Sequence, residues 1–220
     1  MSAEEALIAS GIHYVRGGRT ILDGISLTAT PGSAIAVMGP SGSGKSSLLA
    51  ILAGLETPDA GTVHRGIGPA AIVLQAYGLV SLLTAAENVE VVLQARAIRT
   101  TPVAIIREKA AAALDSVGLS RYADHLVEEL SGGQQQRVAI ARALAADPLL
   151  LFADEFTAEL DHDTKEPVLD LVLGVARRGG IVVIATHDPE IAAQCDRVIH
   201  LVEGRAEHSK ATGFDLSSAG

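Results

Sequence analysis

A stretch rich in glycine and serine, GPSGSGKSS, surrounds one lysine between residues 39 and 47. Gly39, Gly44, Lys45 and Ser46 fit the spacing G-x-x-x-x-G-K-[ST], between the apolar stretch AIAVM and the helical pattern KSSLLAILAGL. In this setting backbone N–H groups surround phosphate oxygens, the lysine adds positive charge, and the serine hydroxyl is a ligand for Mg²⁺. We therefore predict a loop that binds a nucleoside triphosphate with Mg²⁺. Its residues are Gly39, Pro40, Ser41, Gly42, Ser43, Gly44, Lys45, Ser46 and Ser47.

An acidic pair, Asp154 and Glu155, ends the apolar stretch PLLLFA. A carboxylate at the end of a buried strand can hold Mg²⁺, and the next carboxylate can polarise an attacking water. The alternative, a solvated acidic pair in a loop, fits poorly because the stretch before it is apolar throughout. We predict Asp154 as the metal-side residue and Glu155 as the general base.

A phosphate-binding loop alone would leave kinases, GTPases, helicases and transport ATPases open. The stretch LSGGQQQRVAIARAL, residues 130–144, narrows the choice. Through it the chain resembles, over about residues 8–206, the nucleotide-binding subunits of ABC transporters. Ser131 can cap the following helix, and two glycines let the helix approach an anion. The resemblance implies that Ser131, Gly132, Gly133 and Gln134 contact the γ-phosphate held by a second copy of the chain.

The resemblance implies roles for further residues that carry little information alone. Gln75 matches the glutamine that senses Mg²⁺ and the attacking water, and His187 matches the switch histidine at the γ-phosphate. Tyr14 matches the aromatic residue that stacks on adenine, although a lone tyrosine is more often part of a core. Asp161 keeps the aspartate of the D-loop.

The chain departs from the family pattern in two places near the acidic pair. Phe156 stands where the family usually has proline, and AELD, residues 158–161, replaces the commoner D-loop form with small residues. Only eleven residues separate Val63 from Gln75, fewer than the family normally places there, so we expect a trimmed strand or hairpin near the β-subdomain. These departures concern loop geometry more than chemistry.

The order of patterns along the chain predicts one α/β domain over residues 1–220. Strand patterns fill residues 8–38, an alanine-rich helical insert covers about 76–146, and apolar strands alternate with helices afterwards, which indicates a buried parallel sheet. VEVVL, residues 89–93, is ambiguous between helix and strand. The resemblance implies a P-loop NTPase with a RecA-like core, an antiparallel β-subdomain and a helical subdomain. We expect a loosely held polar tail at about 207–220.

Composition limits the partners of the chain. The formal net charge of −9 has the wrong sign for a surface that follows nucleic acid or anionic lipid. No apolar run reaches the roughly 18 to 20 residues that cross a bilayer, and the acidic start MSAEEALIAS does not resemble an export signal. Cys195 is interpreted as a small buried residue.

The leading hypothesis is the ATPase subunit of an export or extraction transporter. Two copies would enclose two ATP molecules, and a separate integral-membrane permease would hold them at the cytoplasmic face of the membrane. Three stretches resemble the lipoprotein-release, macrolide-export and haem-export group: LQAYGLVSLLTAAENV, LSGGQQQRVAIARAL and THDPEIAAQCDRVIHLVEGR. The alternatives are a non-transport ABC ATPase, acting as a cytosolic assembly factor or a regulator of cell-wall hydrolases, and a P-loop kinase, which would leave the LSGGQ stretch unexplained.

Overall fold

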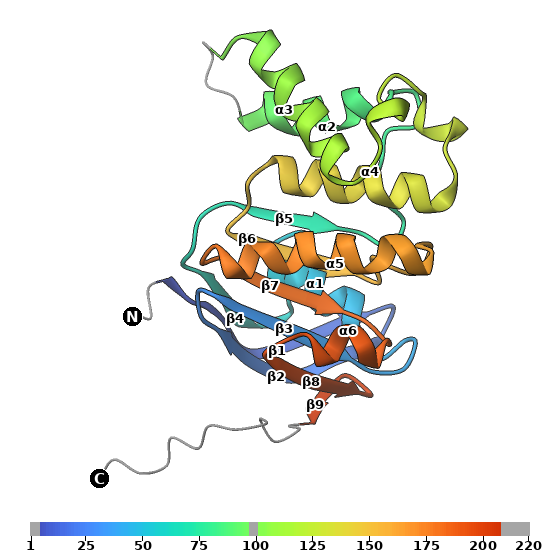
Figure 1. Cartoon of the computed structure of the whole chain (residues 1–220). Helices are drawn as coiled ribbons and strands as arrows, with labels where there is room; N and C mark the ends of the chain where they lie inside the picture. The colour runs from blue at the N-terminus through green and yellow to red at the C-terminus, as the bar shows by residue number, and fades with distance from the viewer. Residues whose placement is uncertain (1–4, 97–100, 208–220) are drawn as a thin grey trace.

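The computed structural model describes residues 5–96 and 101–207 (Figure 1). Its strands are β1 (Leu7–Arg16), β2 (Arg19–Ala29), β3 (Ser33–Met38), β4 (Ala60–Arg65), β5 (Ala70–Val73), β6 (Leu150–Asp154), β7 (Ile181–Ala185), β8 (Arg197–Val202) and β9 (Arg205–Glu207). Its helices are α1 (Lys45–Ala53), α2 (Ala85–Arg96), α3 (Val103–Ser116), α4 (Gly132–Ala145), α5 (His162–Arg177) and α6 (Pro189–Ala193), with the short 3-10 helices η2 (Ser120–Tyr122) and η3 (Val127–Glu129). The strands form sheets of order β5-β6-β7-β3-β8-β9 and β2-β1-β4.

The larger sheet is parallel from β5 to β8, and β9 pairs antiparallel at its edge. Every residue of β6 and β7 is buried, because helices or strands cover both faces of the sheet. Their side chains still alternate between the faces: Leu151 and Val182 belong to one hydrophobic core, and Leu150 and Val183 to the other. The parallel sheet therefore separates two hydrophobic cores, one on each of its faces.

The first core lies between the parallel sheet and the antiparallel sheet, and α1 fills it (Figure 1). Helix α1 contacts β2 of the antiparallel sheet and β5, β6 and β7 of the parallel sheet, and its buried residues are Lys45, Leu48, Leu49, Ile51 and Leu52. This packing fixes the start of α1 next to the end of β3. The loop between them, residues 39–44, is consequently held at both ends by buried elements.

The second core lies on the opposite face, under α5 and the helical layer of α2, α3 and α4. Figure 1 shows these three helices stacked beyond β5, away from the antiparallel sheet. Helix α4 begins at Gly132, so the LSGGQ stretch forms the N-terminus of a helix in this layer.

The predicted mixed α/β architecture is confirmed, with a largely parallel sheet, a separate antiparallel sheet and a helical layer. VEVVL lies inside α2. Between Val63 and Gln75 the chain needs only residues 66–69 to pass from β4 to β5. Of the predicted tail, only Glu207 lies within the described residues. Among the described residues, no helix combines the length and the hydropathy that a bilayer crossing requires.

Candidate active site

The predicted phosphate-binding loop requires glycine at two of its positions. Gly39 has φ 156°, and a Cβ there would lie 2.2 Å from the Leu201 carbonyl oxygen. Gly44 has φ 104°, and a Cβ there would lie 2.9 Å from the Ile21 carbonyl oxygen. Gly44 also precedes α1 without any side-chain cap, so the N–H groups of the first helical turn are left to an anion.

The Lys45 ammonium lies at the floor of this loop. Its Nζ donates to the carbonyl oxygens of Gly39 (2.8 Å) and Pro40 (3.2 Å), and its side chain is only 9% exposed. The nearest carboxylate oxygen, Oε1 of Glu155, is 3.8 Å away. A buried cation held mainly by neutral carbonyl groups is well suited to charge-assisted bonds with phosphate.

Asp154, the last residue of β6, presents an unsatisfied oxygen beside the loop. Its side chain is buried, and Oδ1 has no hydrogen-bond partner among the described residues. Burial raises the pKa of this carboxyl group, while a hydrogen bond from Ser46 lowers it; Glu155 raises it and Lys45 lowers it to a smaller degree. A carboxylate oxygen and a hydroxyl oxygen are the hard donors that Mg²⁺ takes, usually together with phosphate oxygens and water. The residues present therefore fit the predicted Mg²⁺.

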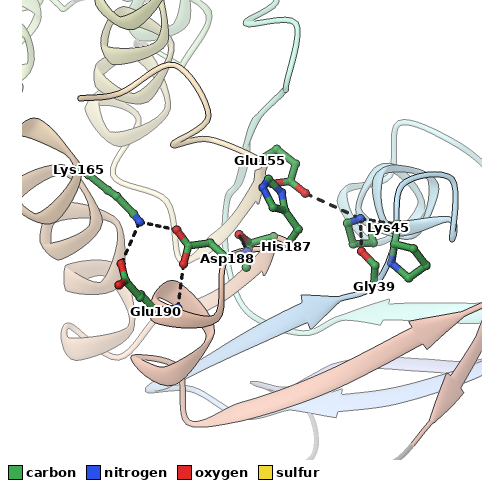
Figure 2. A network of polar contacts seen from close by, with 9 residues as sticks. Gly39, Lys45, Glu155, Lys165, His187, Asp188 and Glu190 are labelled. Atoms are coloured by element: carbon green, nitrogen blue, oxygen red, sulfur yellow. Dashed lines mark hydrogen bonds and ion pairs between the residues drawn. The ribbon is translucent and has the colours of Figure 1, made fainter. Parts of the chain in front are cut away.

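Glu155 lies between the ammonium of Lys45 and the ring of His187, as Figure 2 shows. Its φ of 45° is left-handed, which turns the chain sharply at the end of β6, and its N–H donates to the Ala185 carbonyl oxygen at 3.0 Å. Its Oε2 is 2.9 Å from His187 Nδ1. The Glu155 side chain is 14% exposed and that of His187 is 75% exposed, so the pair stands at the border between the protein and the solvent.

Lys45, Glu155 and His187 line one cavity of about 600 Å³, and Asp154 lies outside its lining. The residues around it are Ile21, Ser41, Gly42, Gly44, Lys45, Ser46, Ser47, Gln75, Glu155, Ala158 and His187. Most come from segments that follow β3, β5, β6 and β7, which are neighbours in the parallel sheet. The carboxyl ends of parallel strands are the usual position for ligands in such sheets. Of the predicted loop residues, Gly39, Pro40 and Ser43 lie outside the cavity lining: the first two accept from Lys45 through their carbonyl oxygens, and the buried Ser43 hydroxyl has no partner within the described part of the chain.

The LSGGQ residues lie apart from this cavity. Ser131 caps α4 by accepting from Gln134 N–H (3.3 Å), and the Gln134 side chain accepts from Ser131 N–H (2.9 Å). A Cβ on Gly133 would lie 2.5 Å from the Glu159 carbonyl oxygen, so close packing on the segment after β6 requires glycine. Asp161 caps α5 through Thr164 N–H at 2.9 Å. None of these residues lines the cavity of their own chain.

Comparison with known proteins decides the family. The profile of the ABC transporter family matches residues 22–158 of this chain. The chain belongs to the ABC transporter family. It is an ABC-type ATPase domain, and the match includes the phosphate-binding loop, Gln75, the LSGGQ stretch and the acidic pair.

Curated relatives of this ABC domain include proteins of different transport systems. It is 41% identical over 209 residues to an uncharacterized ABC transporter ATP-binding protein of Mycobacterium tuberculosis, and 39% identical over 212 residues to the methionine import ATP-binding protein MetN of Caulobacter vibrioides. Each alignment covers 87% of this chain but only 62% of the relative. The lipoprotein-releasing system ATP-binding protein LolD 1 of Rhodopseudomonas palustris is 39% identical, with 84% of this chain and 88% of that protein covered.

Solved structures of the ABC cassette MJ0796 have the same fold as this ABC domain. The dimeric structure of that bacterial cassette gives a TM-score of 0.90 at 34% identity, covering 94% of this chain and all of that one. A second dimeric structure, a post-hydrolysis state bound to ADP and Pi, gives a TM-score of 0.88 at 33% identity.

Tyr14, which was predicted to stack on adenine, lies in the first core and outside the cavity lining. Its ring is 7% exposed within the first core, its hydroxyl donates to Glu56 Oε2 at 2.8 Å, and it does not line the cavity. The cause is an irregularity of β1 around Gly11: the buried residues are Leu7 and Ala9 before it, but Ile12 and Tyr14 after it. The shift turns Tyr14 toward the first core, and adenine stacking on this ring stays a prediction of the resemblance.

Sequence reasoning missed two kinds of residue near the site. Ile21 and Ala158 line the cavity as ordinary small or apolar residues, and nothing in their sequence context marks them. Arg142 of α4 donates to the carbonyl oxygens of Tyr77 (2.8 Å) and Gly78 (2.6 Å), just after Gln75. Tyr77 has a left-handed φ of 59°. The sequence places Arg142 shortly after LSGGQ, but it does not indicate that Arg142 binds the backbone of Tyr77 and Gly78.

Proposed function

We propose that this ABC domain hydrolyses Mg²⁺–ATP as one half of a head-to-tail pair and drives a separate membrane permease. The observation that carries the proposal is the position of Glu155, at the rim of the cavity and in contact with both Lys45 and His187. A carboxylate in that position can accept a proton from a water that attacks the γ-phosphate.

The proposed reaction uses groups of this chain at each stage. Lys45 exchanges its carbonyl partners for β- and γ-phosphate oxygens, while the N–H groups at the start of α1 bind the phosphates. Water attacks the γ-phosphorus as Glu155 takes its proton, the bond to the bridging oxygen breaks, and ADP and phosphate remain. His187 orients Glu155 and contacts the γ-phosphate, and Gln75 orients the water. Mg²⁺, when bound at Asp154 and Ser46, neutralises part of the phosphate charge.

The pairing of two copies is supported by the location of the LSGGQ stretch. Ser131 is exposed and does not line the cavity of its own chain, although its helix N-terminus is suited to bind an anion. A second copy in head-to-tail orientation would bring its Ser131 to this cavity and would complete the site. The MJ0796 cassettes, which share this fold, are dimeric.

The transport role rests on family membership and on sequence. We propose that a permease holds the pair at the cytoplasmic face of the membrane and contacts the helical layer, where Val80 and Leu82 are exposed (49% and 82%). The relatives include both an import and a lipoprotein-releasing protein. Export or extraction, of a haem, lipoprotein, lipid, peptide or antibiotic, therefore rests on the three sequence stretches of that group.

The decisive variant is Glu155→Gln, which keeps the size of the side chain but removes the proton acceptor. We expect phosphate release to fall by about 10²- to 10⁴-fold while ATP binding remains. Because the uncleaved γ-phosphate then links two chains, the variant should elute as a dimer with ATP and Mg²⁺ in size-exclusion chromatography. Glu128→Gln, at an exposed glutamate of η3, is the matched control and should behave as wild type.

Near wild-type turnover by Glu155→Gln would remove this residue from the role of general base.

For the transport role, the tagged chain is purified from detergent-solubilised membranes of its host. Co-purification of an integral-membrane protein is the expected result. Recovery of soluble partners alone would favour the non-transport alternative, an assembly factor or a regulator of cell-wall hydrolases.

A further inference from the structure

Lys165, in the first turn of α5, joins that helix to the loop after β7. Its Nζ makes a short ion pair with Asp188 Oδ2 and lies 3.4 Å from Glu190 Oε2 (Figure 2). The side chains of Lys165 and Asp188 are only 22% and 23% exposed, while that of Glu190 is 83% exposed. The hydrogen bond between the first two raises the pKa of Lys165 and lowers that of Asp188, so both are charged at neutral pH.

Asp188 has both carboxylate oxygens engaged. Oδ1 accepts from Glu190 N–H at 2.8 Å and caps α6, Oδ2 pairs with Lys165, and its own N–H donates to the Thr186 hydroxyl at 3.0 Å. The preceding residue is His187, whose side chain is 75% exposed and therefore has little packing of its own. The direction of the His187 ring toward Glu155 consequently depends on how the loop is anchored on its other side.

Asp161, which precedes α5, contacts the turn of this helix that contains Lys165. Lys165 N–H donates to the Asp161 carbonyl oxygen at 3.0 Å, and Asp161 caps the same helical turn through Thr164. One turn of helix thus links the segment after the acidic pair to the segment that carries His187.

We propose that Lys165 is a positioning residue for ATP hydrolysis: its ion pair with Asp188 anchors the His187 loop to α5 and so keeps His187 at hydrogen-bond distance from Glu155. The inference rests on the roles proposed above for Glu155 and His187. Asp161 caps α5, and the segment before it packs on Gly133 of the LSGGQ stretch, which would meet a second copy; the same ion pair therefore transmits displacement of that segment to His187.

The test compares Lys165→Met with Lys165→Arg and Asp188→Asn in the full chain. Methionine keeps the length of the side chain without its charge, and we expect kcat to fall about tenfold, because small misplacements of reacting groups are costly. KM for ATP and the affinity for a fluorescent ATP analogue should stay within about twofold. Arginine, which can still pair with Asp188, should restore most of kcat. The double variant Lys165→Met/Asp188→Asn should be no slower than the worse single variant, because both remove the same pair.

Two controls separate this role from general effects of charge or stability. Glu190→Gln removes only the weaker, exposed partner of Lys165, and Lys109→Met makes the same substitution at an exposed lysine of α3. Both should leave kcat unchanged. The ¹⁵N resonance of His187 Nδ1 reports its hydrogen bond without turnover, and it should shift in Lys165→Met but not in Lys109→Met.

An unchanged kcat, an equal loss in the affinity for ATP, or an unmoved His187 resonance in Lys165→Met would overturn the inference. A wild-type chain that hydrolyses no ATP would contradict the proposed function instead. In that case the His187 resonance alone decides whether Lys165 positions the ring.

Discussion

Asp154→Asn should stabilise the nucleotide-free protein and remove its response to Mg²⁺. The carboxylate is 4% exposed, and Oδ1 has no hydrogen-bond partner among residues 5–96 and 101–207. The substitution removes a charge that burial and Glu155 destabilise and that Lys45 stabilises. Burial has the largest effect on this charge, so its removal should stabilise the folded protein. The amide has no new partner at this position, so the gain comes from removal of the buried charge, and we expect it to be about 1 kcal/mol. For a chain of this size the melting temperature should rise by roughly 2–4 °C.

The pH dependence of this difference has a definite sign. Burial raises the pKa of Asp154 above the ordinary value of 3.8, so the folded protein binds this proton more tightly than the unfolded chain does. The stabilisation that this gives the wild type is fully present below pH 3.8 and is lost as the pH rises through the raised pKa. The advantage of Asp154→Asn in melting temperature should therefore be largest at neutral pH and should shrink on acidification through that window.

Differential scanning calorimetry at neutral pH, with ATP plus EDTA or ATP plus Mg²⁺, measures both effects. At about 100 times Kd, Mg²⁺–ATP should stabilise the wild type by about 2.7 kcal/mol, whereas Asp154→Asn should gain no more with Mg²⁺ than with EDTA. Asp170→Asn, at an exposed carboxylate of α5, is the matched control and should stay within about 0.5 kcal/mol of the wild type. A lower melting temperature for Asp154→Asn without nucleotide, or a retained gain from Mg²⁺, would refute the reasoning.

Three further outcomes follow from the site and its surroundings. Lys45→Ala should nearly abolish ATP binding, since it removes the buried cation of the loop, and unchanged affinity in titration calorimetry would argue against that role. Ser131→Arg should leave ATP binding by single chains intact but block dimer formation and hydrolysis; loss of binding to the monomer would contradict the head-to-tail pair. Cys195 is partly buried, and burial raises its pKa to about 12, so this thiol should react with maleimide at pH 7 much more slowly in the native protein than after unfolding; equal rates in the two states would contradict this.

The sequence was most informative where chemistry depends on residues that are close along the chain. The loop around Lys45, the cap at Ser131 and the apolar strand before Asp154 each need only a few consecutive residues, so spacing and residue type were enough to predict them. The apolar strands likewise predicted a buried parallel sheet.

Contacts between distant residues could not be predicted in the same way. Arg142 lies 65 residues from Tyr77, and Lys165 lies 23 residues from Asp188. The burial of Tyr14 has a more specific cause: one irregularity in β1 changes which residues face inward, and a simple alternation of strand residues does not reveal where it falls.

The two hydrogen bonds of Arg142 join the segment after Gln75 to helix α4, so that the two move together. Because one guanidinium group holds two consecutive carbonyl oxygens, those of Tyr77 and Gly78, this segment cannot slide along α4 without breaking both bonds at once. From Arg142 to Gly132 the helix is about 15 Å long and has no break. A displacement of Gln75 at the cavity is therefore transmitted through Arg142 to α4, and it changes the orientation of the helix that Ser131 caps.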